Sequence, residues 1–503
     1  MLLRTLILIF GFFCVFEASD SIERILGVRY AEPLERRYTD SRLISKFIRP
    51  KANDWPNRCI VDRPEEGNSE DCLFLSILKH AEAEKETPAL VYVTNEALSE
   101  AKLVKLVNKE LSVIVAHARQ GVYASYNEEV YSDSDLENLF KFLTNERDSL
   151  GIGPITVLAE EHLAEAVSRV LEKLDVQRAI LFGGNALTRT YGRERFASRV
   201  ASKLKRLSSC DLPSEEQALH CLRALPELFY PFGDPYRVPK LRKTKNRQIP
   251  TMYGLWKKEA PERYVYPTTT NFTADFDYRN FKQFLAGLIP DATYQNGPLV
   301  RRVALHHYVH TKGDKKDTYF LFEAMREMLW DRDFAVPTDR LIAHFTKSKA
   351  NQVWLFQYGI DNPPKNCLQD GGWEDIEPFC TRLLGYYTRF ASKGKPTEEG
   401  CSATNPSFPA LGTSKRDYFI RIHADGTPEW DFDFYRSSVA FWRDLAPELG
   451  QIELAGRRDA VFQEVEEPDP LEEFDDVQPW HVNQARENAR ILGEQAGEIK
   501  EEL

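Results

Sequence analysis

The chain has 503 residues, 42% of them hydrophobic, which suffices for one large domain or for two or three ordinary ones. Its formal net charge of -11 argues against a general nucleic-acid binder, because such proteins carry excess lysine and arginine to neutralise phosphates. Enzymes, small-molecule carriers and protein-binding modules are the classes that stay open.

The amino terminus has the pattern of a secretory signal peptide, which we assign to residues 1–19. Arg4 supplies the positive charge, an apolar run spans 6–16, and Ala18 or Ser19 is the candidate cleavage point. The alternative is a membrane anchor, but this run is too short to cross about 30 Å of hydrocarbon. No later stretch reaches the length of a membrane helix. We therefore expect no membrane span and a soluble mature protein in an oxidising compartment.

Eight cysteines are present, and Cys14 would leave with the signal peptide. Two pairs lie close in sequence and could each close a short loop, which stabilises by roughly 2–3 kcal/mol. The other three cannot all pair with one another, and their connectivity stays open. The seven mature cysteines are Cys59, Cys72, Cys210, Cys221, Cys367, Cys380 and Cys401. There is no C-x-x-C sequence, so neither a redox motif nor a zinc ribbon is favoured.

Strand-like apolar runs alternate with helical patterns along most of the chain. This alternation predicts an α/β fold with a mostly parallel sheet and helices on both faces. In chain order, the expected strands are 89–93, 111–118, 155–158, 178–183 and 351–358, the expected helices are 135–146 and 162–174, and 416–426 is expected to form one side of a hairpin. There is no internal repeat.

The composition changes after residue 457, so we expect one folded domain over 20–457 and a separate tail over 458–503. Residues 464–476 hold eight acids and no base, which predicts a solvated linker. An apolar stripe of helical spacing follows, which fits a short surface helix or a helix that binds itself or a partner. The stripe consists of Val482, Ala485, Ala489, Leu492, Ala496, Ile499 and Leu503.

Seven segments, in order, resemble the type B carboxylesterases, the family that includes the cholinesterases. They are GVRYAEPL (27–34), NSEDCLFLSI (68–77), SVIVAHARQG (112–121), VQRAILFGGNAL (176–187), CDLPSEEQALHCLRALP (210–226), DRDFAVP (331–337) and YYTRFASKGKPT (386–397). The resemblance covers about 25–448. It implies an α/β-hydrolase fold with a central mixed sheet, and disulfides Cys59–Cys72 and Cys210–Cys221.

The family's nucleophile turn, G-x-S-x-G, corresponds to AEEHL (159–163), so Glu161 takes the place of the serine. FGGNA (182–186) looks like a second candidate, with Asn185 at the serine, but the order of segments rejects it. Both glycines of the turn are missing as well, and glycine is the residue that tolerates such a turn. We expect Glu161 to be an ordinary carboxylate at a helix start, with a carboxylate nucleophile as the alternative.

The other catalytic parts are also altered. In the segment that resembles the family's base region, Trp373 replaces histidine, or Gly372 does if the alignment shifts by one. Asp275 lies near the place of the acid, with Asp277 as the alternative. No histidine occurs between 344 and 423, and His162, beside the turn, is expected to be a surface or packing residue.

The family's oxyanion loop, H-G-G-G, corresponds to four residues after the strand 89–93: Thr94, Asn95, Glu96 and Ala97. The glycine-backed amides are gone, and Glu96 would repel the negative charge that such a loop stabilises. With base, nucleophile and oxyanion loop all altered, the sequence predicts that hydrolysis is lost while the fold is kept.

The remaining motifs indicate surface segments, a glycosylation sequon and a retrieval signal rather than a catalytic or metal site. His306, His307 and His310 could suggest a metal, but we expect a surface helix and no metal or cofactor. The basic stretch 237–247 is expected to be a solvated loop or a partner contact. Asn271 begins a glycosylation sequon. The final residues, KEEL, resemble the K-D-E-L retrieval signal; they are Lys500, Glu501, Glu502 and Leu503.

Together these features predict a non-catalytic carboxylesterase-like protein of the endoplasmic-reticulum lumen, with secretion as the alternative location. Its partners would be a secretory protein that it binds or helps to fold, and a retrieval receptor. Two other functions stay open: an ester hydrolase with altered chemistry, and a small-molecule carrier that uses the family's binding gorge.

Overall fold

The computed structural model describes residues 21–35, 37–51, 54–61, 65–126, 129–188, 201–202, 204–206, 208–225, 249–256, 276–291, 294–346, 352–360, 367–369, 376–397, 407–411, 418–432 and 434–451. The chain divides into two compact units. The first, here called the sheet unit, comprises Met1–Ala186, Pro239–Lys257 and Ile342–Phe432. The second, here called the helical unit, comprises Leu187–Val238, Lys258–Leu341 and Asp433–Leu503.

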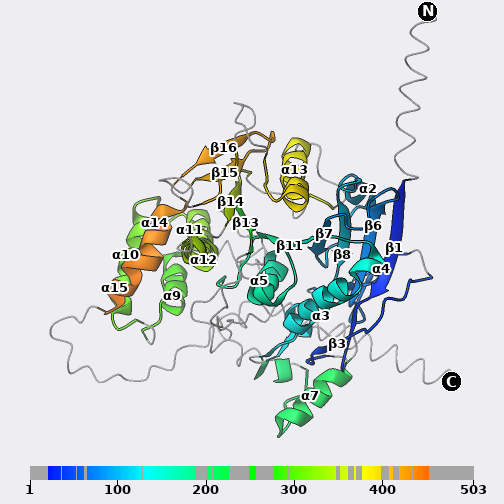
Figure 1. The fold of residues 1–503 in the computed structure, drawn as a ribbon. Helices are drawn as coiled ribbons and strands as arrows, with labels where there is room; N and C mark the ends of the chain where they lie inside the picture. Colours follow the sequence, from blue (N-terminus) through cyan, green and yellow to red (C-terminus); the bar gives the residue numbers. More distant parts are fainter. Residues whose placement is uncertain are drawn as a thin grey trace, which may run out of the picture. The chain divides into compact units, whose positions relative to one another are not determined.

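The sheet unit is built on one ten-stranded mixed sheet (Figure 1). Neighbouring strands run in parallel from β8 to β15, while β1, β6 and β16 are antiparallel to their neighbours. The predicted α/β class with a mostly parallel sheet is therefore confirmed. In spatial order the strands are β1 (Ile22–Arg29), β6 (Phe74–His80), β8 (Ser112–Ala116), β7 (Ala89–Val93), β11 (Ile155–Glu160), β12 (Arg178–Phe182), β13 (Thr251–Trp256), β14 (Val353–Tyr358), β15 (Phe419–Ile422) and β16 (Pro428–Asp431).

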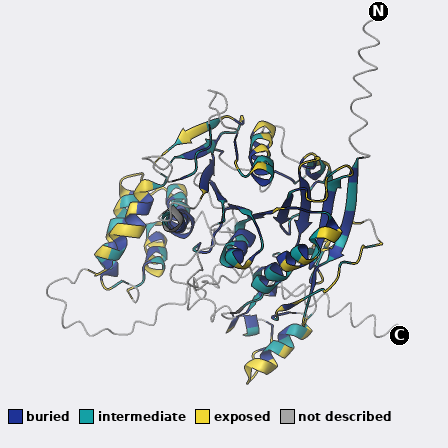
Figure 2. Ribbon diagram, viewed as in Figure 1, coloured by how far each residue is buried: buried dark blue, intermediate teal, exposed yellow. Residues whose placement is uncertain are grey.

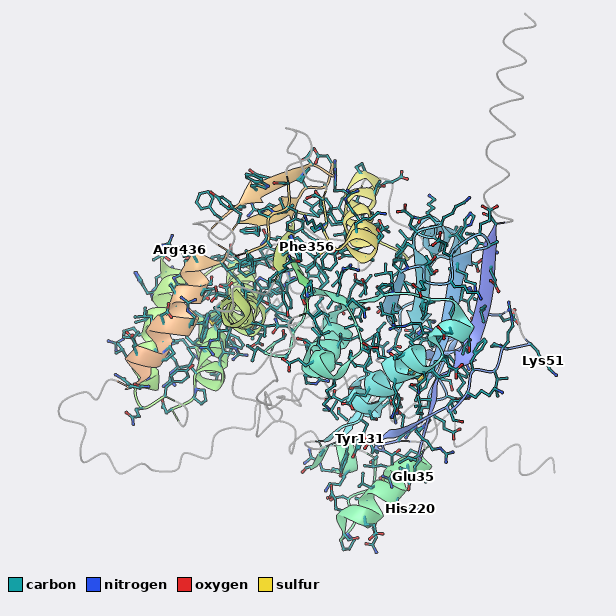
Figure 3. All side chains as sticks on the ribbon, in the orientation of Figure 1. Glu35, Lys51, Tyr131, His220, Phe356 and Arg436 are labelled. Carbon is teal, nitrogen blue, oxygen red and sulfur yellow. A yellow bond between two sulfur atoms is a disulfide. The ribbon has the colours of Figure 1, made fainter. Side chains whose placement is uncertain are left out.

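The central strands are apolar because both faces of the sheet are covered. Every residue of β7, β8, β13 and β14 is buried, as Figure 2 shows for the middle of the sheet. Such continuous apolar runs are typical of parallel sheets with helices on both sides. Phe356 of β14, labelled in Figure 3, packs there against Phe182 and Tyr358.

Helices of the sheet unit follow or connect these strands. They are α2 (Glu100–Val104), α3 (Ser132–Asn145), α4 (Arg147–Leu150), α5 (Glu161–Val170) and α13 (Glu377–Lys393), with 3-10 turns η1 (Gly121–Tyr123) and η2 (Leu171–Lys173). The crossover helix α5 links β11 to β12 and packs beside α3 (Figure 1). Small two-stranded pairs complete the unit: β2 (Ala31–Pro33) with β3 (Ser41–Leu43), β4 (Arg58–Cys59) with β5 (Asn68–Ser69), and β9 (Ser125–Tyr126) with β10 (Glu129–Val130).

The helical unit contains helices that are interrupted by wider turns. Its first described helix is α7 (Glu215–Ala224), which Ser214 caps by accepting a hydrogen bond from the backbone of Gln217 at 3.2 Å. The others are α9 (Tyr278–Leu288), α10 (Gly297–Leu305), α11 (Thr318–Trp330), α14 (Arg436–Val439) and α15 (Ala446–Gln451), with π-helical turns η4 (His306–His310), η5 (Asp331–Ala335) and η6 (Ala440–Leu445). The helix α12 (Val336–Thr346) belongs to this unit as far as Leu341 and to the sheet unit from Ile342.

Three disulfides occur among the described residues. Cys59–Cys72 and Cys210–Cys221 are the two pairs that the sequence resemblance implies. The third, Cys367–Cys380, settles a pairing that the sequence left open and ties the segment 367–369 to α13. Three disulfides fit a protein of the secretory pathway. In the part of the chain that the structure describes, no helix is long and apolar enough to cross a membrane.

Candidate functional site

The strand-to-helix turn between β11 and α5 keeps a strained backbone. Strand β11 continues through Ala159 and Glu160, two residues further than predicted, and α5 begins at once with Glu161. Glu161 has φ +52°, in the left-handed region that residues other than glycine rarely adopt. The expected position of Glu161 at a helix start is therefore confirmed, and its backbone conformation is of the kind that clusters at functional turns.

The tight approach of a second segment explains why this turn cannot relax. A Cβ atom added to Gly184 would lie 2.4 Å from the carbonyl oxygen of Glu161 and 2.8 Å from Cγ of Glu165. Gly183 has φ +68°, and an added Cβ would lie 2.1 Å from the ring of Trp256. The FGGNA segment is thus not a nucleophile turn. Its glycines allow the chain after β12 to pass directly beside the turn at Glu161.

The carboxylate before the turn is held by the neighbouring strand. Tyr92, buried on β7, donates its hydroxyl hydrogen bond to Oε2 of Glu160 at 2.7 Å. Tyr92 is the register partner of Leu158 in the parallel pair of β7 and β11. Glu160 lies two residues after Leu158, so its side chain is on the same face of the sheet as the Tyr92 side chain. The Glu160 side chain is therefore held by Tyr92 at the carboxyl end of β11.

Aromatic rings fill the neighbouring carboxyl ends of β12, β13 and β14. Phe182 contacts Trp256 edge-on at 4.5 Å between ring centroids and stacks on Tyr358 at 4.1 Å. Burial, followed by the nearby Tyr387 and Glu160, raises the pKa of Tyr358 well above its usual value, so the phenol is neutral at physiological pH. Beside the turn, the sheet edge is thus packed with neutral rings.

The loop 94–97, which the sequence resemblance compares with an oxyanion loop, makes hydrogen bonds within the protein. Asn95 is buried, and its Nδ2 donates to the carbonyl of Ala118 at 2.7 Å. The backbone N–H of Glu96 donates to Oγ1 of Thr94 at 3.1 Å, and the Glu96 side chain accepts from Nε2 of Gln369 at 3.0 Å. An amide used inside the protein is not free to stabilise a developing oxyanion.

The segment 367–369 fixes the same loop from the other side. Besides the bond from Gln369 to Glu96, the carbonyl of Leu368 accepts from the backbone N–H of Ser99 at 2.8 Å, and Lys102 donates to the carbonyl of Gln369. The Cys367–Cys380 disulfide anchors this segment to α13. The segment 367–369 therefore connects both the loop after β7 and the start of α2 to α13.

Sequence reasoning missed His117, which lies under this loop. It follows β8, is buried, and its Nδ1 lies 2.6 Å from the carbonyl oxygen of Thr94. Because a carbonyl only accepts, Nδ1 carries the proton. Burial lowers the pKa of His117 to about 4, so the ring is neutral at physiological pH. A histidine directly after a buried strand, next to the loop 94–97, was the available signal.

The other predicted catalytic positions contribute no assembled triad in the described part of the chain. The Nδ1 atom of His162 lies 3.9 Å from Oε2 of Glu165, one turn along α5. Asp277 accepts hydrogen bonds from the backbone of Arg279 and Asn280 and caps α9, and these bonds, with Asn280 first, lower its pKa.

Several predictions concern positions outside the described residues. They are the signal peptide 1–19, the basic stretch 237–247, Asn271, Asp275, Gly372, Trp373, Cys401, the linker 464–476, the stripe 482–503 and the four residues Lys500, Glu501, Glu502 and Leu503. For the triple histidine, no group of metal-binding side chains occurs among the described residues. His310 instead pairs through Nε2 with the hydroxyl of Tyr278 at 2.9 Å.

Chemically, the turn presents a carboxylate where acyl transfer would need an activated hydroxyl. In the loop 94–97, the backbone N–H of Glu96 and the side-chain Nδ2 of Asn95 are hydrogen-bonded within the protein. Known proteins add no further identification: the chain matches no protein-family model and no curated protein sequence.

Proposed function

We propose that this chain is a non-catalytic relative of the type B carboxylesterases, with the α/β-hydrolase fold, that acts as a binding or folding-assistance protein in the secretory pathway. One observation carries the proposal: the strained turn between β11 and α5 survives, with Glu161 at φ +52° where the family places its serine. A strand-to-helix turn of this kind presents the nucleophile in active hydrolases. Keeping the turn without its hydroxyl favours an inherited scaffold over a working enzyme.

The loop 94–97 supports the same interpretation. In an acyl-transfer enzyme the corresponding amides must point at the reacting oxygen. Here the backbone N–H of Glu96 is bound to Thr94, while the side chains of Asn95 and Glu96 are bound to Ala118 and Gln369. Loss of one oxyanion donor alone costs about 3–4 kcal/mol of transition-state stabilisation. Loss of the hydroxyl nucleophile as well leaves no reason to expect esterase turnover.

A second candidate function is a hydrolase with altered chemistry, in which Glu161 is the reacting carboxylate. The left-handed backbone of Glu161 favours it, because strain of about 1–3 kcal/mol persists most often where function needs it. Close packing of Gly184 on the Glu161 carbonyl offers a structural cause for the same strain. We therefore rank the binding role first.

Three disulfides support a place in the secretory pathway, and KEEL supports retention in the endoplasmic-reticulum lumen. The partner would be another secretory protein, and a retrieval receptor would read Lys500 to Leu503. This location fits a helper that meets newly made chains.

The test is proximity labelling from the full chain with its native carboxyl terminus, beside a variant that lacks Lys500 to Leu503. We expect the intact protein to stay inside the cell, to label lumenal secretory proteins and to carry high-mannose glycan. Asn271→Gln serves as the control that assigns the glycan. Deletion of the four residues should move the protein into the medium.

If the intact protein is secreted with complex glycans and the deletion changes nothing, the retention proposal is wrong. If the protein is retained but labels the same set of proteins as an unrelated lumenal control, the binding role is wrong.

A further inference from the structure

A buried polar chain joins the three π-helical turns of the helical unit. Tyr308 lies in η4, Asp331 in η5 and Trp442 in η6, and all three are buried. Nε1 of Trp442 donates to the hydroxyl oxygen of Tyr308 at 2.8 Å, and that hydroxyl donates to Oδ2 of Asp331, also at 2.8 Å. Each π-helical turn thus contributes one member of a continuous hydrogen-bonded path.

The convergence of these turns is informative because π-helical turns are rare and concentrate at functional positions. A single one could reflect a local packing accident. Three turns from separate parts of the chain, at 306–310, 331–335 and 440–445, instead share one contact network. The feature that they share is the path that ends on the carboxyl group of Asp331.

The surroundings of Asp331 are polar but nearly balanced in charge. Ser438 of α14 donates a hydrogen bond to it, while Glu327 of α11 and Lys312, after η4, act on it through space. Lys312 pairs with Glu327 at 2.8 Å, so it does not offer Asp331 a full countercharge. The adjacent Arg332 is committed to Asp333 through two hydrogen bonds, at 2.7 and 3.1 Å.

Burial therefore dominates the titration of Asp331. It raises the pKa of this carboxyl to about 7, against the opposing effect of the hydrogen bonds from Ser438 and Tyr308. A carboxylate that is kept in water titrates near 4. Between about pH 4 and about pH 7, Asp331 is therefore protonated in the packed junction and would be ionised in an opened one.

We propose that Asp331 is the proton-binding centre of a pH-sensitive junction in which η4, η5 and η6 pack more tightly as the pH falls from about 8 to about 6. This inference does not rest on the proposed function. In a secretory protein it would link the packing of α14, η6 and α15 to the pH of the compartment.

The direction follows from linkage. A carboxyl whose pKa is higher in the packed state than in the open state binds more protons when packed, so rising pH favours opening. With the pKa of Asp331 moving from about 7 when packed to its usual value of 3.8 when open, the opening equilibrium constant should rise about tenfold between about pH 6 and pH 8.

Lys312 lies over the Tyr308 ring at 5.1 Å from its centroid. His307 also contacts the path, and its effect on the pH dependence has the opposite sign. Its ring lies edge-on to Tyr308 at 4.7 Å and stacks on Phe441 at 5.5 Å. Burial lowers the pKa of His307, so the packed junction prefers the neutral ring and loses stability as the pH falls. His307 therefore cannot cause loosening at rising pH.

Hydrogen exchange of the full chain, followed by mass spectrometry and corrected for intrinsic exchange rates, tests the inference. In the wild type, peptides that cover Tyr308 and 438–445 should open more at about pH 8 than at about pH 6, by less than about tenfold because His307 opposes Asp331. Peptides from β11 and α5 serve as the internal reference. Asp331→Asn should lose this increase with pH, whereas the exposed control Asp314→Asn should behave like wild type.

An unchanged pH response in Asp331→Asn would overturn the proposal, as would an equal response in all peptides. If Asp331→Asn does not fold, the infrared band of a protonated carboxylic acid is titrated in the wild type and in Tyr308→Phe. Loss of the Tyr308 donor should move the midpoint to higher pH. Absence of a band that titrates near neutrality, or an unmoved midpoint, would also overturn it.

Discussion

Replacing Gly184 by alanine should destabilise the sheet unit, because the new methyl group has no room. Its carbon would lie 2.4 Å from the carbonyl oxygen of Glu161, 3.3 Å from the carbonyl carbon and 2.8 Å from Cγ of Glu165. The first two atoms belong to the backbone at the turn and cannot rotate away. Insertion of a methyl group into a packed site of this kind costs about 1–3 kcal/mol.

The control is Gly385→Ala on the exposed face of α13 in the same unit. An added Cβ there meets nothing within 4 Å, so alanine should stabilise by up to about 1 kcal/mol through its higher helix propensity. Both variants would be unfolded in urea, with hydrogen exchange at β11 and α5 as the local readout. The reasoning fails if Gly184→Ala matches wild type within about 0.3 kcal/mol while Gly385→Ala gains stability as expected.

Two further substitutions test the account of the turn and of the sheet unit's buried charges. Glu161→Gly should be more stable than Glu161→Ala by about 0.5–1 kcal/mol in thermal or urea unfolding, because only glycine relieves the left-handed φ; equal stability would argue against strain. Asp135→Asn should cost about 3–5 kcal/mol, since it leaves the buried Arg119, bound at 2.7 and 2.8 Å, without its countercharge. The partly exposed Asp133→Asn on the same helix, which loses a 2.9 Å pair with Arg169, should cost at most about 1 kcal/mol; similar losses for both would contradict the role of burial.

The sheet was predictable from sequence because its strands are buried on both faces. Continuous apolar runs such as ALVYV leave little choice of structure between polar neighbours. The end of β11 was not predictable. Ala159 and Glu160 remain in the strand because β12 continues beside them as far as Phe182, and that is a tertiary constraint.

The strain at Glu161 was hidden for a similar reason. A turn without glycine suggests a relaxed backbone, but Glu161 has φ +52°, and its carbonyl packs closely against Gly184, which is distant in sequence. His117 was overlooked because its significance depends on the loop 94–97 above it, which belongs to a different strand.

In the helical unit, the spacing of residues in the sequence was not enough to predict the local structure. The three histidines at 306–310 suggested a regular surface helix, whereas this stretch forms a π-helical turn that buries Tyr308. Hydrophobic spacing does not show that Asp331 and Trp442, distant in sequence, both hydrogen-bond to the Tyr308 side chain of this turn. The Cys367–Cys380 pairing likewise required the fold, because three cysteines in that region offered more than one partner.

Ester turnover by the purified protein tests the central claim most directly. Wild type and Glu161→Gln would be compared on short and long acyl esters and with a fluorophosphonate probe. The account predicts no saturable turnover, no labelling by the probe and no difference between the two proteins. Saturable turnover in the wild type that disappears in Glu161→Gln would contradict it, and would make Glu161 a catalytic carboxylate.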